Sequence, residues 1–296
     1  MADQRGRLGV STIVVSGESG GGNLTLATTL KAKREAVLEA LAAAQIEAQP
    51  TPFSPLGIRI PGKPALQKMS IYTDGHVEVQ DEGSQLLALL TNPKRGEMVV
   101  DFCAGAGGKT LALGALMRNT GRLYAFDISA HRLENLKPRL ARSGLSNVYS
   151  SQIAHENDDR IKRLRGKIDR VLVDAPCSGL GTLRRNPDLK WRQSPKAIDE
   201  LQVKQTAILA SAARLLKPGG RLVYATCSII PDENEGIADA FTAAHPDFVP
   251  LNAAEALEAA GVENAAALVT PAGHLRLWPH KHATDGFYAA VWQKKD

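Results

Sequence analysis

Two cysteines follow mostly apolar runs in the second half of the sequence. The run 170–173 leads into Asp174 and Cys177, and the run 222–225 leads into Cys227. If both runs are parallel strands, their carboxyl ends meet at one edge of a sheet, where ligands bind in open α/β folds. We therefore expect the carboxylate and both thiols to line one crevice, and at least one thiol to be catalytic.

A third strand-like run, 98–102, opens into a glycine-rich turn before a helical pattern. The turn reads Cys103-Ala104-Gly105-Ala106-Gly107-Gly108-Lys109. Its backbone N–H groups can approach a ligand closely at the N-terminus of the following helix. The pattern predicts a nucleotide-like ligand, with a turn kept for packing alone as the alternative.

Two known nucleotide motifs nearly fit this turn and fail. Thr110 stands where a dinucleotide fingerprint needs its last glycine, and Cys103 stands where a Walker A loop needs its first. Asp127 ends the next predicted strand, where an acid can accept hydrogen bonds from ribose hydroxyls. The sequence therefore favours S-adenosylmethionine as the cofactor over a dinucleotide or ATP.

A methyl donor beside a cysteine nucleophile indicates methyl transfer to carbon 5 of a pyrimidine. That carbon is a poor nucleophile until a thiolate adds at carbon 6, and covalent catalysis divides the difficult step in two. Asp174 is expected to hold or protonate the ring while the adduct forms. Cys103, inside the turn, is expected to be structural or to touch the cofactor only through its backbone.

Composition limits the remaining possibilities. The chain has 296 residues, 44% of them hydrophobic, which allows one large domain and a small one. It has no apolar run of about 18 residues and no signal pattern, so we expect a cytoplasmic, monomeric protein without membrane contact. Its three cysteines lack C-x-x-C spacing, and His280 and His282 lack a third ligand at suitable spacing, so no metal is expected.

The formal charge of +5 is concentrated in the segment 184–196. Interleaved basic and aromatic side chains suit a single-stranded nucleic acid, whose phosphates they neutralise and whose bases they stack on. The alternative is a solvated loop with a packed tryptophan. The predicted RNA contacts are Arg184, Arg185, Lys190, Trp191 and Arg192.

Strand and helix patterns alternate through most of the chain, which predicts an α/β fold with a doubly wound, mostly parallel sheet. Expected strands cover 98–103, 121–127, 147–152, 169–174 and 220–226, and expected helices cover 84–90, 108–118, 130–143, 156–165, 196–216 and 232–243. Two further strands, within 274–278 and 287–292, are expected to form an antiparallel edge.

The N-terminal part has a different character. Residues 1–22 are polar and glycine-rich, and we expect them to be poorly ordered. A helix from Lys31 and strands near 24–29 and 57–60, with a proline-rich passage 50–64, predict a small α+β appendage over residues 23–75 that associates with RNA. Residues 76–296 are expected to form the S-adenosylmethionine-dependent domain.

Several segments together resemble one family. DFCAGAGGKT, VDAPCSGLGTLRRNPDLKWR, VYATCSIIPDENE and TDGFYAAVW resemble the Sun-type (RsmB/Fmu) ribosomal RNA cytosine carbon-5 methyltransferases, and EVQDEGSQLLALL resembles the segment that leads into their catalytic domain. The resemblance extends from about residue 24 to the C-terminus. It implies a Rossmann-like fold and methylation of a cytosine in RNA, 16S ribosomal RNA being the expected substrate. It also implies Cys227 as the nucleophile, Cys177 as an aid to product release, and cofactor contacts from the 103–109 loop, Asp127 and Asp174.

The sequence also departs from that family. Ile153-Ala154-His155-Glu156 stands where members usually carry an aspartate that binds the adenine amine, and the usual helical RNA-binding domain is not found ahead of the appendage. Target selection is therefore expected to differ, or the chain to be truncated.

Two other functions remain possible from sequence. DNA cytosine methyltransferases also carry a proline–cysteine motif on the fourth strand but use that cysteine alone, so Cys227 favours RNA. A non-catalytic RNA-binding assembly factor could keep the same fold, although the presence of Cys177, Cys227 and Asp174 argues against it.

Overall fold

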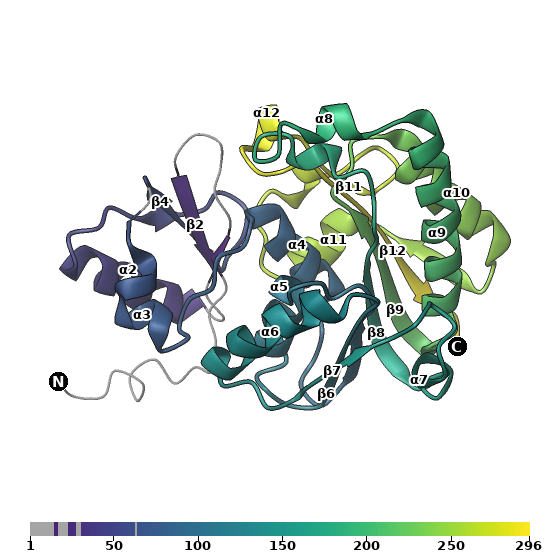
Figure 1. Cartoon of the computed structure of the whole chain (residues 1–296), viewed down its shortest axis with the longest axis horizontal. Helices are drawn as coiled ribbons and strands as arrows, with labels where there is room; N and C mark the ends of the chain where they lie inside the picture. The colour runs from purple at the N-terminus through teal and green to yellow at the C-terminus, as the bar shows by residue number, and fades with distance from the viewer. Residues whose placement is uncertain (1–14, 17–22, 28–30, 63) are drawn as a thin grey trace.

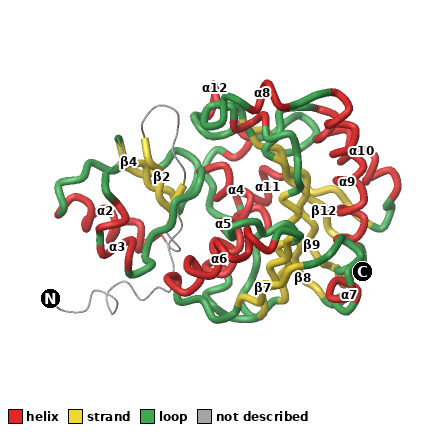
Figure 2. The backbone as a smooth tube through the Cα atoms, in the orientation of Figure 1, coloured by secondary structure: helices red, strands yellow, loops and turns green. Residues whose placement is uncertain are grey.

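The computed structural model describes residues 15–16, 23–27, 31–62 and 64–296. They form a four-stranded antiparallel sheet near the N-terminus and a larger, mostly parallel sheet with helices on both faces (Figure 1). The tube view separates the two groups of strands and shows helices on either side of the larger one (Figure 2). The predicted α/β class, with a small N-terminal α+β region, is confirmed.

The larger sheet has the strand order β10-β12-β9-β8-β5-β6-β7, and β11 pairs with β12. Its strands are β5 Met98–Asp101, β6 Arg122–Asp127, β7 Val148–Gln152, β8 Ile168–Asp174, β9 Leu216–Thr226, β10 Phe248–Leu251, β11 Leu275–Leu277 and β12 Phe287–Lys294. Strands β5 to β9 pair in parallel, and the last three pair antiparallel. The chain passes from β5 to β6 and β7 and then returns to the other side of β5 for β8. The crevice outside the carboxyl ends of strands at such a reversal is where ligands bind.

The five predicted parallel strands are all present. Four of them, β5, β6, β8 and β9, carry buried apolar residues, whereas β7, at the end of the sheet, has no buried residue. Val99 and Val100 of β5 and Leu172 of β8 are fully buried. They face opposite sides of the sheet, since Val99 and Leu172 pack in one core cluster and Val100 in the other. Near-continuous apolar runs of this kind are typical of parallel strands.

Helices from both halves of the chain cover the sheet. On one face pack α4 Glu82–Thr91, α5 Gly108–Leu116, α6 Ala130–Ser143 and α11 Ala253–Glu258; on the other pack α7 Asp159–Lys162, α9 Pro195–Ala213 and α10 Glu235–Ala244. Single turns complete the domain: η2 Leu180–Thr182, α8 Leu189–Arg192, η3 Pro231–Glu233, η4 Ala265–Leu268 and α12 Pro279–His282.

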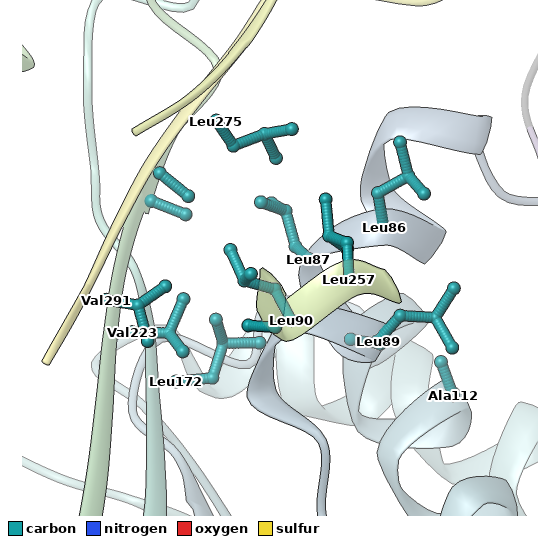
Figure 3. Packing of buried hydrophobic residues seen from close by; sticks show 14 of the residues in the cluster. Leu86, Leu87, Leu89, Leu90, Ala112, Leu172, Val223, Leu257, Leu275 and Val291 are labelled. Atoms are coloured by element: carbon teal, nitrogen blue, oxygen red, sulfur yellow. The ribbon is translucent and has the colours of Figure 1, made fainter. Parts of the chain in front are cut away.

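Helix α4 lies in the centre of the core. Asp81 caps it by accepting a hydrogen bond from the Gly83 N–H at 2.9 Å, and all ten of its residues are buried. Figure 3 shows Leu87 and Leu90 on the side toward the sheet and Leu89 near Ala112 of α5, with Leu257 of α11 beside them. Helix α4 is thereby packed against the larger sheet and two other helices.

Three predicted elements differ from the observed fold. The helix predicted for 156–165 is reduced to the four residues of α7, because Asp158 caps it at its start and turns follow from residue 163 to Gly166. Strands β11 and β12 pair antiparallel at one end of the sheet, as predicted, but β12 lies between β9 and β10, and β10 was not predicted. Helix α9 ends at Ala213, earlier than predicted, because β9 begins at Leu216.

The N-terminal region has its own sheet and core. Its elements are β1 Val15–Ser16, β2 Asn23–Ala27, α2 Lys31–Ala43, β3 Gln49–Pro50, β4 Gly57–Pro61, η1 Leu66–Lys68 and α3 Ser70–Thr73. Val37, Ile58 and Ile71 pack together there with Val77. The domain boundary at residue 75 stays a prediction, and of the predicted disordered segment 1–22 only residues 15–16 lie within the described part of the chain.

A buried carboxylate joins this N-terminal region to helix α4 of the larger core. Glu82, at the start of α4, is 2% exposed and accepts hydrogen bonds from the N–H groups of Phe53 and Ser54, both at 2.7 Å. Arg59 of β4 lies 3.8 Å from its second carboxyl oxygen. Burial raises the pKa of Glu82, while the backbone hydrogen bonds and Arg59 act to lower it.

We predict that Glu82→Leu lowers the free energy of unfolding by about 3 kcal/mol, because two buried N–H groups lose their acceptor. Urea denaturation followed by circular dichroism measures the loss. The control is Glu47→Leu, at an exposed glutamate of the same region, which should change stability little. Equal effects of the two substitutions would refute the role given to Glu82.

Candidate active site

A cavity of about 850 Å³ opens at the carboxyl ends of β5, β6, β8 and β9. It is lined by the glycine-rich turn after β5, by Asp127 after β6, and by residues 153–156 after β7. Asp174 and Cys177 contribute from the end of β8, and Cys227 from the end of β9. The structure thus brings the predicted cofactor turn and the predicted catalytic residues to one cavity.

The glycine-rich turn is held in place by close packing and by Asp127. Gly107 has a φ of 84° and precedes α5 directly, and a Cβ atom there would lie 2.1 Å from Leu136 Cδ1. The Asp127 carboxylate accepts hydrogen bonds from the Gly105 N–H at 2.8 Å and from the Ser129 N–H at 2.7 Å. Cys103, Ala104, Gly105, Ala106, Gly108 and Lys109 line the cavity, whereas Gly107 supports the turn from behind.

Two side chains next to the turn are structural. Asp101, at the end of β5, is fully buried and accepts a hydrogen bond from the Thr110 hydroxyl at 2.7 Å. Burial raises the pKa of Asp101 to about 7. Burial likewise raises the pKa of Cys103 well above its ordinary value, so this thiol stays protonated and is a poor nucleophile.

Lys109 reaches across the cavity to Asp174, with its Nζ atom 2.7 Å from the carboxylate. Burial is the largest single effect and acts to lower the pKa of Lys109, but the charge and hydrogen bond of Asp174, together with the nearby Cys227 and Asp101, raise this pKa above its ordinary value. Lys109 and Asp174 line the same cavity as the two thiols. The predictions named both residues but not their contact.

The thiols of Cys177 and Cys227 are adjacent, with 3.5 Å between the Sγ atoms. The hydrogen bond to Cys227 and burial together raise the pKa of Cys177 well above its ordinary value. Cys177 is therefore held as a neutral thiol that can share a proton with its neighbour. The two cysteines are 50 residues apart in sequence, and the parallel pairing of β8 with β9 brings them together.

Glu233 fixes the relative position of the two cysteine loops. Its carboxylate is fully buried and accepts hydrogen bonds from the Ser178 N–H at 2.8 Å and from the Ser178 and Ser228 hydroxyls at 2.5 Å each. Gln205 of α9 donates a fourth at 3.0 Å. Each serine directly follows one of the cysteines. The role of Glu233 was not predicted from the sequence, although its place shortly after Cys227 could have marked it as a candidate site residue.

Arg184 and Arg185, predicted to bind RNA phosphates, are engaged inside the protein. The Arg185 guanidinium lies 2.8 Å from the Asp81 carboxylate and also pairs with Asp285. Arg184 lies 3.5 Å from Asp285 and 3.7 Å from Asp81. Burial and the nearby Asp81 charge raise the pKa of Asp285 to about 6, despite the two arginines. Both arginines thus anchor the segment to the catalytic domain, which the basic pattern alone did not reveal.

The other predicted RNA contacts lie on the surface, on α8. Trp191 is 80% exposed, and the Lys190 ammonium lies 4.9 Å from its ring centroid. Arg192 forms an exposed ion pair with Asp188 at 2.7 Å. These side chains are more exposed than those of Arg184 and Arg185, whose RNA contacts stay a prediction.

The segment after β7 lines the cavity with residues 153–156, among them Glu156, whose carboxylate accepts a hydrogen bond from the Asn157 side chain at 2.8 Å. Asp158 accepts a hydrogen bond from the Ala154 N–H at 3.0 Å and caps α7 through the Arg160 N–H at 2.9 Å. His155 Nδ1 accepts from the Asn157 N–H at 3.1 Å. The residue that would bind an adenine amine therefore stays unassigned.

We predict that Glu233→Gln lowers the free energy of unfolding by about 3 kcal/mol, because an amide nitrogen cannot accept the hydrogen bonds that one carboxylate oxygen receives. Urea denaturation measures the change, and Asp232→Asn, at the exposed neighbour, is the matched control. If the two substitutions have the same effect, the carboxylate does not hold the loops.

Among the described residues, none of the helices is long and apolar enough to cross a membrane. The same part of the chain contains no cluster of three or more histidine, cysteine, aspartate or glutamate side chains that could hold a metal ion.

Comparisons with solved structures identify the fold. A methyltransferase homologue from Pyrococcus horikoshii is similar, with a TM-score of 0.75 and 28% sequence identity over 92% of this chain and 86% of that one. The structure of NSun6 from Pyrococcus horikoshii with SFG has a TM-score of 0.77 and 20% identity, over 93% of this chain and 91% of that one. At 20% identity, the similarity to NSun6 shows a shared fold and nothing more.

Comparisons of sequence identify the family. The probable ribosomal RNA small subunit methyltransferase B of Synechocystis sp. is 37% identical over 90% of this chain, and the protein of the same description from Bacillus subtilis is 34% identical over 90%. The chain covers 58% of the length of each relative. Residues 88–293 match the model of the 16S rRNA methyltransferase RsmB/F family, and the chain therefore belongs to this family.

Proposed function

We propose that this protein transfers a methyl group from S-adenosylmethionine to carbon 5 of a cytosine in RNA, with small-subunit ribosomal RNA as the substrate. The observation that carries the proposal is the pair of thiols 3.5 Å apart, in one cavity with the glycine-rich turn. A second thiol next to the nucleophile distinguishes this arrangement from a site with one catalytic cysteine.

The cavity fits the proposed cofactor. S-Adenosylmethionine supplies an electrophilic methyl group on its sulfonium sulfur. The backbone of residues 103–109 would hold it, because the first N–H groups of α5 have no acceptor within the helix. Asp127 would accept hydrogen bonds from the ribose, since each carboxylate oxygen that binds a backbone N–H retains a further lone pair.

The thiols would act in sequence on the cytosine. The Cys227 thiol would lose its proton to water as its Sγ atom forms a bond to carbon 6. The electron pair of the carbon 5–carbon 6 double bond would move to carbon 5, which takes the methyl group as the bond between methyl and the sulfonium sulfur breaks. Carbon 5 would then lose its proton to water, and its electron pair would restore the double bond as the bond between Sγ and carbon 6 breaks and the sulfur leaves with that bond's electrons. Cys177, at hydrogen-bond distance from Cys227, would assist this second stage.

Asp174 and Lys109 would orient the base during the reaction. Their ion pair lines the same cavity as both thiols. A carboxylate can accept a hydrogen bond from the exocyclic amine of cytosine, and an ammonium group can donate to its carbonyl. The pair also supplies a charged proton donor next to the ring while negative charge develops there.

RNA binding would involve α8 at the surface. Lys190 and Arg192 carry exposed positive charge, and Trp191 offers an exposed ring on which an unpaired base can stack. Arg184 and Arg185 would support this surface from within through their ion pairs with Asp81 and Asp285. The N-terminal region, residues 23–75, would add further RNA contacts.

We predict that Cys227→Ala lowers methyl transfer by at least about a thousandfold and yields no covalent RNA species, because no adduct forms without the nucleophile. Cys177→Ala should instead accumulate a denaturant-resistant protein–RNA band that requires S-adenosylmethionine. The assay uses unmodified small-subunit RNA, tritiated cofactor and mapping of the labelled nucleotide, with DNA of the same sequence in parallel.

The double variant, with both cysteines replaced by alanine, is the control and should show no band. A band from Cys227→Ala but none from Cys177→Ala would exchange the two roles. Label on DNA alone, or at an atom other than carbon 5 of cytosine, would refute the proposed reaction.

We predict that Trp191→Ala weakens RNA binding by about 2 kcal/mol through the loss of base stacking. Fluorescence anisotropy with a labelled single-stranded fragment at fixed salt concentration measures the affinity. Tyr149→Ala removes another exposed aromatic side chain, on β7, and should leave the affinity unchanged. Unchanged binding by Trp191→Ala would mean that α8 is only a solvated surface.

A further inference from the structure

The segment 78–82, which connects the N-terminal region to α4, is a buried polar strip. Glu78, Gln80, Asp81 and Glu82 are each less than 9% exposed. Glu78 pairs with Arg139 of α6 at 3.1 Å and also with Arg142. Asp81 and Glu82 have the partners described above. Each acid of the strip therefore has a cation or backbone N–H groups that compensate for its burial.

Gln80 is the exception in this strip. It is 6% exposed, and neither its side-chain nitrogen nor its side-chain oxygen has a hydrogen-bond partner. Among the described residues, it is the one side chain with both polar atoms buried and unpaired. An unpaired buried polar group costs about 1–3 kcal/mol. Because Gln80 also lines the cavity, a ligand bound there can supply the missing partners.

The position of Gln80 within the cavity indicates what it binds. Its Nε2 atom lies 3.8 Å from the point that a Cβ on Gly108 would occupy, so the amide faces the first residue of α5. The Arg139 Nη2 atom lies 3.7 Å from the same point. The unpaired N–H groups at the start of this nine-residue helix and a nearby guanidinium favour a carboxylate there.

We infer that the Gln80 carboxamide binds the α-amino-acid end of the cofactor. An amide both donates and accepts hydrogen bonds, which matches a zwitterion. Its nitrogen donates to the carboxylate at the start of α5, and its oxygen accepts from the ammonium group. This inference rests on the proposed function, because it assumes that S-adenosylmethionine occupies the cavity.

The backbone from which the Gln80 side chain extends is fixed by its neighbours. The Gln85 side chain donates to the Gln80 backbone carbonyl at 3.2 Å. Arg139 donates to Glu78 and also to the Ala106 carbonyl of the glycine-rich turn, at 2.6 Å. The strip and the turn are therefore fixed to the same arginine, which limits the distance between Gln80 and the glycine-rich turn.

The test compares two ligands that differ in the amino-acid end. S-Adenosylhomocysteine carries that end, and 5′-methylthioadenosine has the same adenosine and sulfur without it. We expect Gln80→Leu to weaken S-adenosylhomocysteine about 10- to 100-fold in calorimetry. The affinity for 5′-methylthioadenosine should change less than about twofold. Thermal unfolding of each variant without ligand checks that the fold persists.

Gln293→Leu is the matched control, because Gln293 is exposed on β12 and donates only to the Gly219 carbonyl. Equal weakening of both ligands by Gln80→Leu would show general damage to the cavity and overturn the inference. Unchanged binding of both ligands, with a raised KM for RNA, would assign Gln80 to the base and overturn it as well. If the unmodified protein binds neither ligand, the proposed function itself fails.

Discussion

The catalytic site depends on one buried carboxylate, that of Glu233. A carboxylate without solvent is stable only when hydrogen bonds replace its water, and four donors from Ser178, Ser228 and Gln205 do so here. Two of these residues follow Cys177 and Cys227 directly. Satisfying the buried charge therefore closes the β8 and β9 loops on each other. The short distance between the thiols follows from this requirement, since parallel pairing of the strands brings the loops near but does not fix their ends.

The strip 78–82 imposes a second constraint. Its three acids bind different parts of the molecule: Glu78 binds α6, Asp81 binds the basic segment after β8, and Glu82 binds the N-terminal region. Carboxyl groups this deeply buried would destabilise the fold if any hydrogen-bond partner were withdrawn. The N-terminal region, the cofactor turn and the α8 segment are consequently positioned relative to one another through five consecutive residues. Gln80, in the middle of them, faces the cavity.

The sequence predicted the larger sheet well because its central strands, β5, β8 and β9, are buried and therefore carry apolar runs. The cavity residues were also predictable, since turns and polar residues at strand ends meet at one edge of a parallel sheet. The short length of helix α7 and the presence of strand β10 could not be predicted from sequence. Both depend on contacts with distant segments, such as the pairing of β10 with β12. The same holds for Arg184 and Arg185: a basic run has the same appearance in sequence whether its partners are RNA phosphates or buried carboxylates 100 residues away. The roles of Glu233 and Gln80 could not be predicted, because they depend on burial and on hydrogen-bond partners that the sequence does not reveal.

The two thiols show how one residue type acquires two roles. Cys177 is held neutral because it is buried and bonded to its neighbour. The Lys109–Asp174 ion pair lines the same cavity as both thiols. In the proposed mechanism, a Cys177 thiol that keeps its proton leaves the attack on carbon 6 to Cys227. The two proposed roles therefore rest on the surroundings of the two strand ends, and not on any chemical difference between the cysteines.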